Sequence, residues 1–382
     1  MIKHNIYKDS CDFQKSNLQS HVSLELQLNG KSFTEKDLML LSSALEKCTN
    51  LTNLFLNLGQ NNLGNEGAAQ IGTILEKCLN LETLFLNLDL NEISKKGIQS
   101  LSFSLTKFIH LRVLTLNLDS NYIKQDGAII LGQNLGKCQK LEILILWSSK
   151  NELHSGGASG LLSGLSESKT LKNLTFWFNQ NMINEQGANQ MGSYLAKLKT
   201  LETLKLDLEQ NQIKNGGIVQ FTTKLAENQN LQALTLYLRE NTIDGYGLIS
   251  IIYILTQMQS LSSLTIHLNQ SQIGNEGAYY LVSFLKNFLN LKSLYLFLRD
   301  CLIDDISKFT SVLSELKNLE ILELDLHDNQ IGSQGALNLG VALSNSQKLK
   351  VLNLNLQQQP ILLILNQTNN NKIKTKQQNQ IF

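Results

Sequence analysis

Side chains that could carry out chemistry recur in this chain of 382 residues at intervals of thirty. The clearest row consists of asparagines: Asn61, Asn91, Asn121, Asn151, Asn181, Asn211, Asn241 and Asn329. One amide could contact a substrate, but an evenly spaced row is typical of structure, because a buried amide both donates and accepts hydrogen bonds. We predict that these asparagines form a ladder that satisfies backbone groups in successive turns, interrupted at Ser271 and Cys301.

Cysteines and histidines could bind a metal or act as nucleophiles. Three of the five cysteines share one place in the period: Cys48, Cys78 and Cys138. Hydrophobic residues fill that place elsewhere, as at Phe108 and Met258, so the pattern indicates packing. The six histidines have no metal-ligand spacing and the carboxylates form no evident pair. The sequence therefore predicts no catalytic residue, no metal site and no cofactor.

The elements that position these side chains can be read from "LETLFLNLDLNEISKKGIQSL", residues 81–101. Leucines first alternate, as in a strand with one buried side, and an apolar set with helical spacing then begins at Gly97. Copies of this unit start at Leu51, Leu81, Leu111, Leu141, Leu171, Leu201, Leu231, Leu261, Leu291, Leu319 and Leu349, with a weaker copy from His21. One copy is two residues short. Such a period predicts an α/β solenoid with parallel strands on a concave face and helices on a convex face.

The repeated motif L-x-x-L-x-L-x-L-x-x-N, followed by a helix, resembles that of leucine-rich repeat proteins of the ribonuclease-inhibitor-like class. It departs from their pattern by two residues inserted before the asparagine. The longer unit, with phrases such as "IGNEGA", is similar to leucine-rich repeat families of ciliates, some of which are linked to protein kinase domains. The resemblance implies a leucine-rich repeat solenoid shaped like a horseshoe. No kinase motif is present in this chain.

Three segments follow from the limits of the repeats. Residues 1–20 are predicted to form a partial N-terminal cap, residues 21–358 about twelve repeats of 30 residues, and residues 359–382 a disordered tail rich in Asn, Gln and Lys. The formal net charge of +1 does not indicate nucleic acid or a membrane as a ligand. No apolar run is long enough to be a secretory signal or a membrane span, so we expect a cytoplasmic or nuclear monomer.

The alternating strands should turn one row of residues outward on the concave face. At the seventh place of each unit this row contains Trp147, Trp177, Asp207, Tyr237, His267 and Phe297. Aromatic residues are enriched at the centres of protein interfaces, so we predict a binding site there. Tyr295, Glu209, Arg239 and Arg299 complete the predicted site. Because Ser148 replaces an inward leucine, the alternative is a bulged strand that turns Trp147 inward.

Charged residues on the predicted concave face suggest the chemistry of a ligand. Ten are acidic: Glu25, Asp89, Asp119, Asp207, Glu209, Glu240, Asp300, Glu323, Asp325 and Asp328. Four are basic: Lys150, Lys205, Arg239 and Arg299. This excess of acid disfavours nucleic acid and favours a protein partner with basic and apolar features. We therefore expect a non-enzymatic interaction scaffold. The alternatives are a GTPase-activator-like regulator or a fragment of a larger kinase-linked repeat protein.

Overall fold

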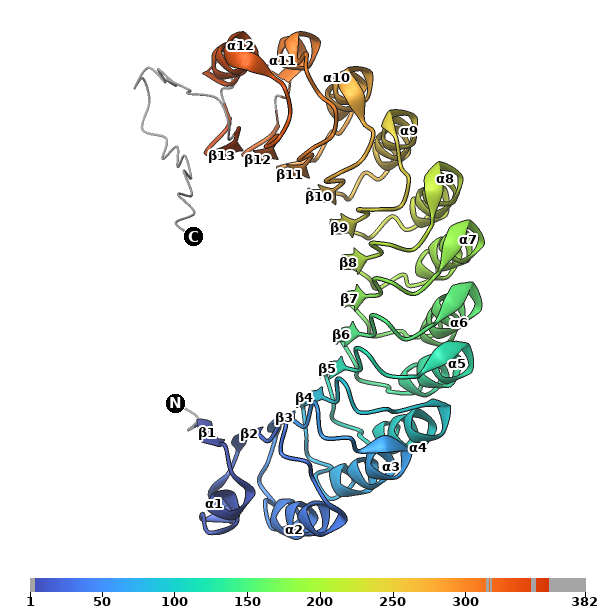
Figure 1. Cartoon of the computed structure of the whole chain (residues 1–382), viewed down its shortest axis with the longest axis vertical. Helices are drawn as coiled ribbons and strands as arrows, with labels where there is room; N and C mark the ends of the chain where they lie inside the picture. The colour runs from blue at the N-terminus through green and yellow to red at the C-terminus, as the bar shows by residue number, and fades with distance from the viewer. Residues whose placement is uncertain (1–3, 314–315, 317, 345–347, 357–382) are drawn as a thin grey trace. The chain divides into compact units, whose positions relative to one another are not determined.

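The computed structural model describes residues 4–313, 316, 318–344 and 348–356. The chain divides into two compact units, residues 1–201 and residues 202–382. In each unit a strand and a helix alternate along the chain, and the helices lie on one side of the strands (Figure 1). We call the side of the sheet that is turned away from the helices the strand face.

The first unit contains seven parallel strands in chain order within residues 4–201. They are β1 (His4–Tyr7), β2 (Ser23–Gln27), β3 (Asn53–Asn57), β4 (Thr83–Asn87), β5 (Val113–Asn117), β6 (Ile143–Trp147) and β7 (Asn173–Trp177). The helices between and after them are α1 (Ser10–Gln14), α2 (Glu35–Leu45), α3 (Gly64–Leu75), α4 (Lys95–Leu105), α5 (Lys124–Leu135), α6 (His154–Leu165) and α7 (Asn184–Leu195). Each strand pairs with the next one along the chain from β1 to β7.

The second unit repeats this order within its described residues. Its strands are β8 (Thr203–Asp207), β9 (Ala233–Tyr237), β10 (Ser263–His267), β11 (Ser293–Phe297), β12 (Ile321–Asp325) and β13 (Val351–Asn355). Its helices are α8 (Lys214–Leu225), α9 (Gly245–Leu255), α10 (Gly274–Leu285), α11 (Ser307–Leu313) and α12 (Gly332–Ser344). The strands pair in parallel from β8 to β13, and the predicted solenoid of strand–helix units is confirmed.

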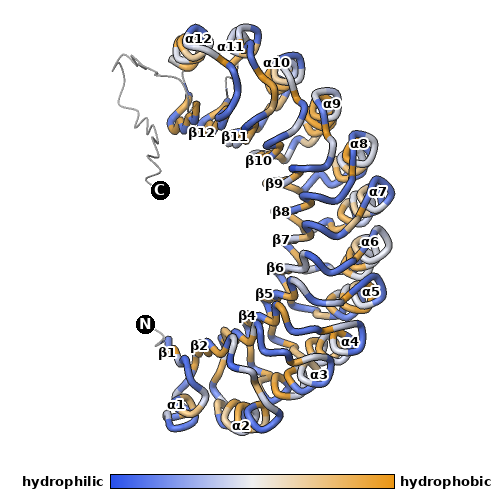
Figure 2. Tube along the Cα trace, viewed as in Figure 1, coloured by the Kyte–Doolittle hydropathy of each residue, from blue (hydrophilic) through white to orange (hydrophobic). Residues whose placement is uncertain are grey.

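The repeat beginning at Leu81 shows why the hydrophobic period changes. In β4, Leu84 and Leu86 are fully buried, whereas Thr83, Phe85 and Asn87 on the strand face are only partly buried. In α4 the buried residues fall on one side of the helix, which packs over those leucines. The period of two thus belongs to the strand and the longer period to its covering helix. Figure 2 shows the apolar positions gathered along strands and helices and the polar ones along the connecting turns.

The strands are shorter than the alternating leucine pattern, because pairing stops at the seventh place of each unit. Beyond it the chain turns towards the helix. The turn after β4 places Leu90 at φ 52° and Glu92 at φ 56°, on either side of Asn91. Residues other than glycine adopt this left-handed conformation at a cost of roughly 1–2 kcal/mol. The turn therefore needs compensating interactions.

The predicted asparagine ladder supplies them. Asn91 is fully buried, and its Nδ2 donates to the carbonyls of Leu58 (2.9 Å) and Asp89 (3.0 Å). Its Oδ1 accepts the backbone N–H groups of Asn61 (3.1 Å) and Leu63 (3.2 Å) in the preceding repeat. Each amide thus joins its own turn to the turn of its neighbour.

The interruption of the ladder is only partial. The thiol of Cys301 donates to the Leu268 carbonyl at 3.1 Å, in the place where Asn329 donates to the Leu298 carbonyl at 2.8 Å. Cys301 therefore belongs to the ladder, although the sequence had set it apart from the other cysteines. Cys301 lies in the short repeat, which begins at Leu291 and whose helix α11 has seven residues where α10 has twelve.

Residues 4–20 add strand β1 to the edge of β2 and bury Phe13 completely. The rings of Tyr7 and His21 lie 5.6 Å and 5.9 Å from the Phe13 ring. The predicted boundary between this segment and the repeats stays a prediction. The predicted tail, residues 359–382, lies outside the described residues.

Replacing Asn91 by alanine tests the ladder. The carbonyls of Leu58 and Asp89 keep other donors, but the N–H groups of Asn61 and Leu63 lose the acceptor that holds them. Leaving two buried donors unpaired should lower the free energy of unfolding by about 3 kcal/mol or more. Urea denaturation followed by circular dichroism measures this loss.

The matched control is Asn50→Ala, which removes one exposed hydrogen bond to the Gln19 carbonyl. It should cost about 1 kcal/mol or less. Equal losses in the two variants would show that the ladder does not stabilise the turns.

Candidate functional site

Three rings stack on the strand face of the second unit. The parallel register places Tyr237, His267 and Phe297 side by side on β9, β10 and β11. The Tyr237 and His267 ring centroids are 4.0 Å apart at an interplanar angle of 10°, and those of His267 and Phe297 are 4.0 Å apart at 4°. Neighbouring strands are about 4.8 Å apart, so the rings lean into direct contact. We call these three residues the ring column.

A lysine covers one end of the ring column. The Lys205 ammonium on β8 lies 5.2 Å from the centroid of the Tyr237 ring, a distance typical of a cation–π interaction. Sequence analysis placed Lys205 on this face but did not include it in the site. The position of Lys205 in its strand could have indicated this contact. Lys205 stands two residues before Asp207, and Asp207 pairs with Tyr237.

An aspartate pairs with the outer residue of the ring column at each end. Asp207 on β8 pairs with Tyr237, and Asp325 on β12 pairs with Phe297. Asp207 is only 3% exposed, and its Oδ1 accepts the backbone N–H of Glu209 at 3.0 Å. The expectation that Asp207 faces solvent was therefore wrong, because its carboxylate is buried and accepts a hydrogen bond from the turn that follows β8. Asp325 keeps partial exposure.

The stack depends on an uncharged imidazole. Burial between two rings, and secondarily the Lys205 ammonium, lowers the pKa of His267 from 6.5 to about 4. At neutral pH the ring is therefore neutral and can contact two aromatic faces without the cost of burying a charge.

Charged residues border the ring column where the strands end. Arg239 Nη2 lies 3.1 Å from Glu240 Oε1, and Arg299 donates from Nε to Asp328 Oδ2 at 2.8 Å. Burial, and next the Asp207 carboxylate, raises the pKa of Glu209. Tyr295 is partly exposed and lies beside Thr265 and Glu323 in the register. An aromatic centre with a polar border is typical of interface anatomy.

The strand face of the first unit carries its own aromatic residues. Phe55 and Phe85 stack with centroids 6.1 Å apart, and the Trp147 ring meets Phe85 edge to face at 6.4 Å. Trp147 and Trp177 are register partners on β6 and β7, and both are partly exposed. Pairing of β6 is regular through Trp147, so the bulge considered at Ser148 is not formed. The predicted site residues thus divide between the two units, with both tryptophans in the first.

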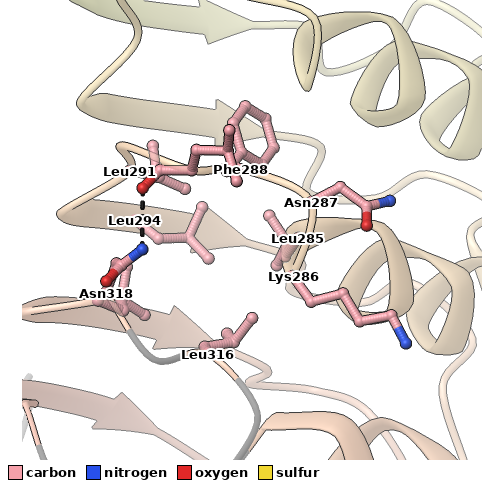
Figure 3. A pocket seen from close by; sticks show the side chains of 10 residues that line it. Leu285, Lys286, Asn287, Phe288, Leu291, Leu294, Leu316 and Asn318 are labelled. Atoms are coloured by element: carbon pink, nitrogen blue, oxygen red, sulfur yellow. Dashed lines mark hydrogen bonds between the residues drawn. The ribbon is translucent and has the colours of Figure 1, made fainter. Parts of the chain in front are cut away.

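A cavity of about 450 Å³ lies beside the end of α10, and sequence analysis did not predict it (Figure 3). Its wall is formed mainly by buried side chains such as Leu285, Phe288 and Leu294. Leu294 points to the core side of β11, opposite to Tyr295, so the cavity is separate from the strand face. Leu316 and Asn318, from the short repeat, complete one side of it. The feature of the sequence that could have indicated this cavity is that the repeat is two residues shorter than the others.

The strand face offers aromatic and charged side chains for contacts with a ligand. Over the described ranges, no cluster of three or more His, Cys, Asp or Glu side chains could hold a metal ion. Over the same residues, no helix has the length and apolar character needed to cross a membrane. The partly exposed rings and their charged border are the features of the strand face that could recognise a ligand.

A family model described as leucine-rich repeat matches residues 47–72 and 317–340. Between these segments the strand–turn–helix unit with its asparagine recurs from β4 to α9. Two segments of the chain are thus similar to leucine-rich repeats. A search of curated proteins finds no match.

Two solved structures show a low similarity to this chain. In the yeast complex of Rad7 and Elc1, one chain is 17% identical, with a TM-score of 0.49 over 92% of this chain and 75% of that chain. Internalin C2 from Listeria monocytogenes is 20% identical, with a TM-score of 0.34 over 66% of this chain and 83% of that chain. These likenesses are too distant to indicate a shared ligand.

The repeats bury four of the five cysteines, and burial predicts that these four thiols react slowly. Burial raises the pKa of Cys48 and Cys138 to about 11 and that of Cys78 and Cys301 to about 12. Only thiolates attack disulfide reagents, and Cys11 alone is exposed. We expect 5,5′-dithiobis(2-nitrobenzoic acid) to titrate one thiol rapidly in the native protein and the rest only after unfolding. The fast thiol should disappear in Cys11→Ser, and a second fast thiol would contradict the packing role.

The depressed pKa of His267 predicts a pH dependence of stability. His267 takes up a proton below about pH 6.5 in the unfolded state, but only near pH 4 in the folded state. The stability that the folded state gains from the neutral ring is therefore lost as the pH falls. When the pH is lowered from 7 to 5, the free energy of unfolding of the unchanged protein should fall by about 1 kcal/mol more than that of His267→Phe. This value is halved because the side chain is partly exposed to solvent. Urea denaturation at both pH values measures it. His110→Phe, at an exposed position, should behave like the unchanged protein.

Proposed function

We propose that this leucine-rich repeat protein is a non-enzymatic scaffold that binds a partner protein on its strand face, the face predicted from the sequence to be concave. The observation that supports this most strongly is the ring column. Large aromatic side chains left partly exposed on a sheet reduce solubility, and they recur where proteins bind one another. Here three rings stand preassembled in contact, so little side-chain freedom remains to be lost on binding.

The charged residues around the ring column favour a partner with basic and apolar features. Negative charge lies beside Phe297, from Glu323 and Asp325 on β12 and from Asp300 after β11. Arg299 is already bonded to Asp328. Opposite charge steers association and suppresses unsuitable partners. Nucleic acid fits poorly, because its phosphates would meet carboxylates. We propose that the protein acts as a monomer in the cytoplasm or the nucleus, where its free thiols remain reduced.

The double variant Tyr237→Ala and Phe297→Ala tests this proposal. A partner isolated with the full chain and identified by mass spectrometry would be purified, and its affinity measured by isothermal titration calorimetry. Loss of two central anchors should weaken binding by roughly 2 kcal/mol or more for each ring. The leucine core lies on the other side of the strands, so the circular dichroism spectrum should be unchanged.

The matched control changes two tyrosines on α9, Tyr246→Ala and Tyr253→Ala. They are 75% and 55% exposed on the helix side of the same unit. This variant should bind the partner with the affinity of the unchanged protein. If it loses the partner while the ring-column variant retains it, the binding surface lies on the helices and the strand-face proposal fails.

A further inference from the structure

We infer that the open end of the ring column, formed by Phe297, Asp325 and Glu323, is a subsite for an arginine side chain of the partner protein. This inference rests on the proposed function and specifies the group that the strand face receives. It follows from a comparison of the two ends of the column.

At the β8 end the chain supplies a complete arrangement of ring, aspartate and cation. Asp207 pairs with Tyr237, and Lys205, two residues earlier on the same face, holds its ammonium 5.2 Å from the Tyr237 ring centroid. The aromatic face attracts the cation through the electron density of its ring. The fold therefore contains an example of a cation held at the end of this ring column.

At the β12 end no cation stands at the place of Lys205, although the Arg299 guanidinium acts on Asp325 from the turn after β11. Asp325 pairs with Phe297, but Glu323 occupies the place that corresponds to Lys205. Asp325 Oδ1 accepts the backbone N–H of His327 at 3.1 Å, and Glu323 Oε2 accepts Nδ2 of Asn353 at 3.2 Å. Neither carboxylate has an ion pair with a described residue. The nearby Arg299 guanidinium is bound to Asp328 through both Nε and Nη2, at 2.8 Å each.

Phe297 and Asp325 are register partners and both are partly exposed, so a ligand can reach the aromatic ring and the shorter carboxylate together. A guanidinium can stack flat on the ring while its N–H groups donate to both carboxylates. Burial raises the pKa of Asp325, an unfavourable environment that a bound cation would relieve. A lysine ammonium can lie over a ring, as Lys205 does, but it lacks the planar set of donors that stacks flat and reaches both carboxylates, so we assign arginine.

The test uses the full chain with isotope-labelled histidine rings and the probe N-acetyl-L-arginine amide. The six histidines give a simple spectrum, and the His267 signal is assigned by its absence in His267→Phe. Because His267 contacts Phe297, its signal should shift saturably, with a dissociation constant on the order of 1–10 mM for so small a probe. N-acetyl-L-citrulline amide, a neutral analogue of nearly the same shape, should bind at least roughly tenfold more weakly.

Asp325→Asn should weaken binding of the arginine probe by about tenfold, since it removes the charge but keeps the shape. Glu276→Gln is the matched control, because it removes an exposed acidic residue on α10 and should leave binding unchanged. The subsite is refuted if the probe gives no saturable shift, if citrulline amide or N-acetyl-L-lysine amide binds equally well, or if Asp325→Asn binds like the unchanged protein.

The outcomes separate this inference from the proposed function. If the ring-column double variant loses the partner while the arginine probe does not bind, the scaffold function stands and the arginine subsite is wrong. If the probe binds as expected but the partner is insensitive to the double variant, the subsite exists and the proposed binding surface is wrong.

Discussion

Buried polar backbone in the turns is the constraint on which this structure depends. Each strand pairs over only five residues or fewer before the chain leaves the sheet, so every turn brings amide and carbonyl groups into an apolar interior. An unpaired buried group costs roughly 1–3 kcal/mol, and a turn contains several. A buried asparagine satisfies such groups in its own turn and in the preceding one, because its amide donates twice and accepts twice, as Asn91 does.

The geometry of the strand face follows from that ladder. Since each asparagine also fixes the preceding turn, strands of one unit enter the sheet in the same register, with seventh-place residues opposite one another. Register alone brings side chains to about the strand spacing, near 4.8 Å. Burial then keeps His267 neutral, and the three rings close to centroid distances of 4.0 Å. A polar network in the interior thus determines an aromatic surface on the opposite side of the sheet.

Sequence reasoning reached the repeat, the order of strand and helix, the buried leucines and the ladder, because each depends on periodic spacing. It located the rows of the strand face for the same reason. It could not predict ring contacts, since stacking depends on side-chain torsions that periodicity does not encode. It also failed for Asp207, whose side chain is buried although its place in the strand is an outward one. The cavity beside α10 escaped prediction because it depends on how a shortened repeat packs, not on which residues it contains.

The strict alternation of inward leucines and outward side chains has an evolutionary consequence. Residues that fill the core and residues on the strand face occupy separate, interleaved positions, as Leu84 and Phe85 do in β4. A mutation at an outward position can change what is recognised while the interior is inherited intact. Duplication of one repeat would add a fresh row of such positions without redesigning the others. The outward positions of the strand face can therefore be substituted one at a time. New specificities can arise in this way through small steps that the fold tolerates.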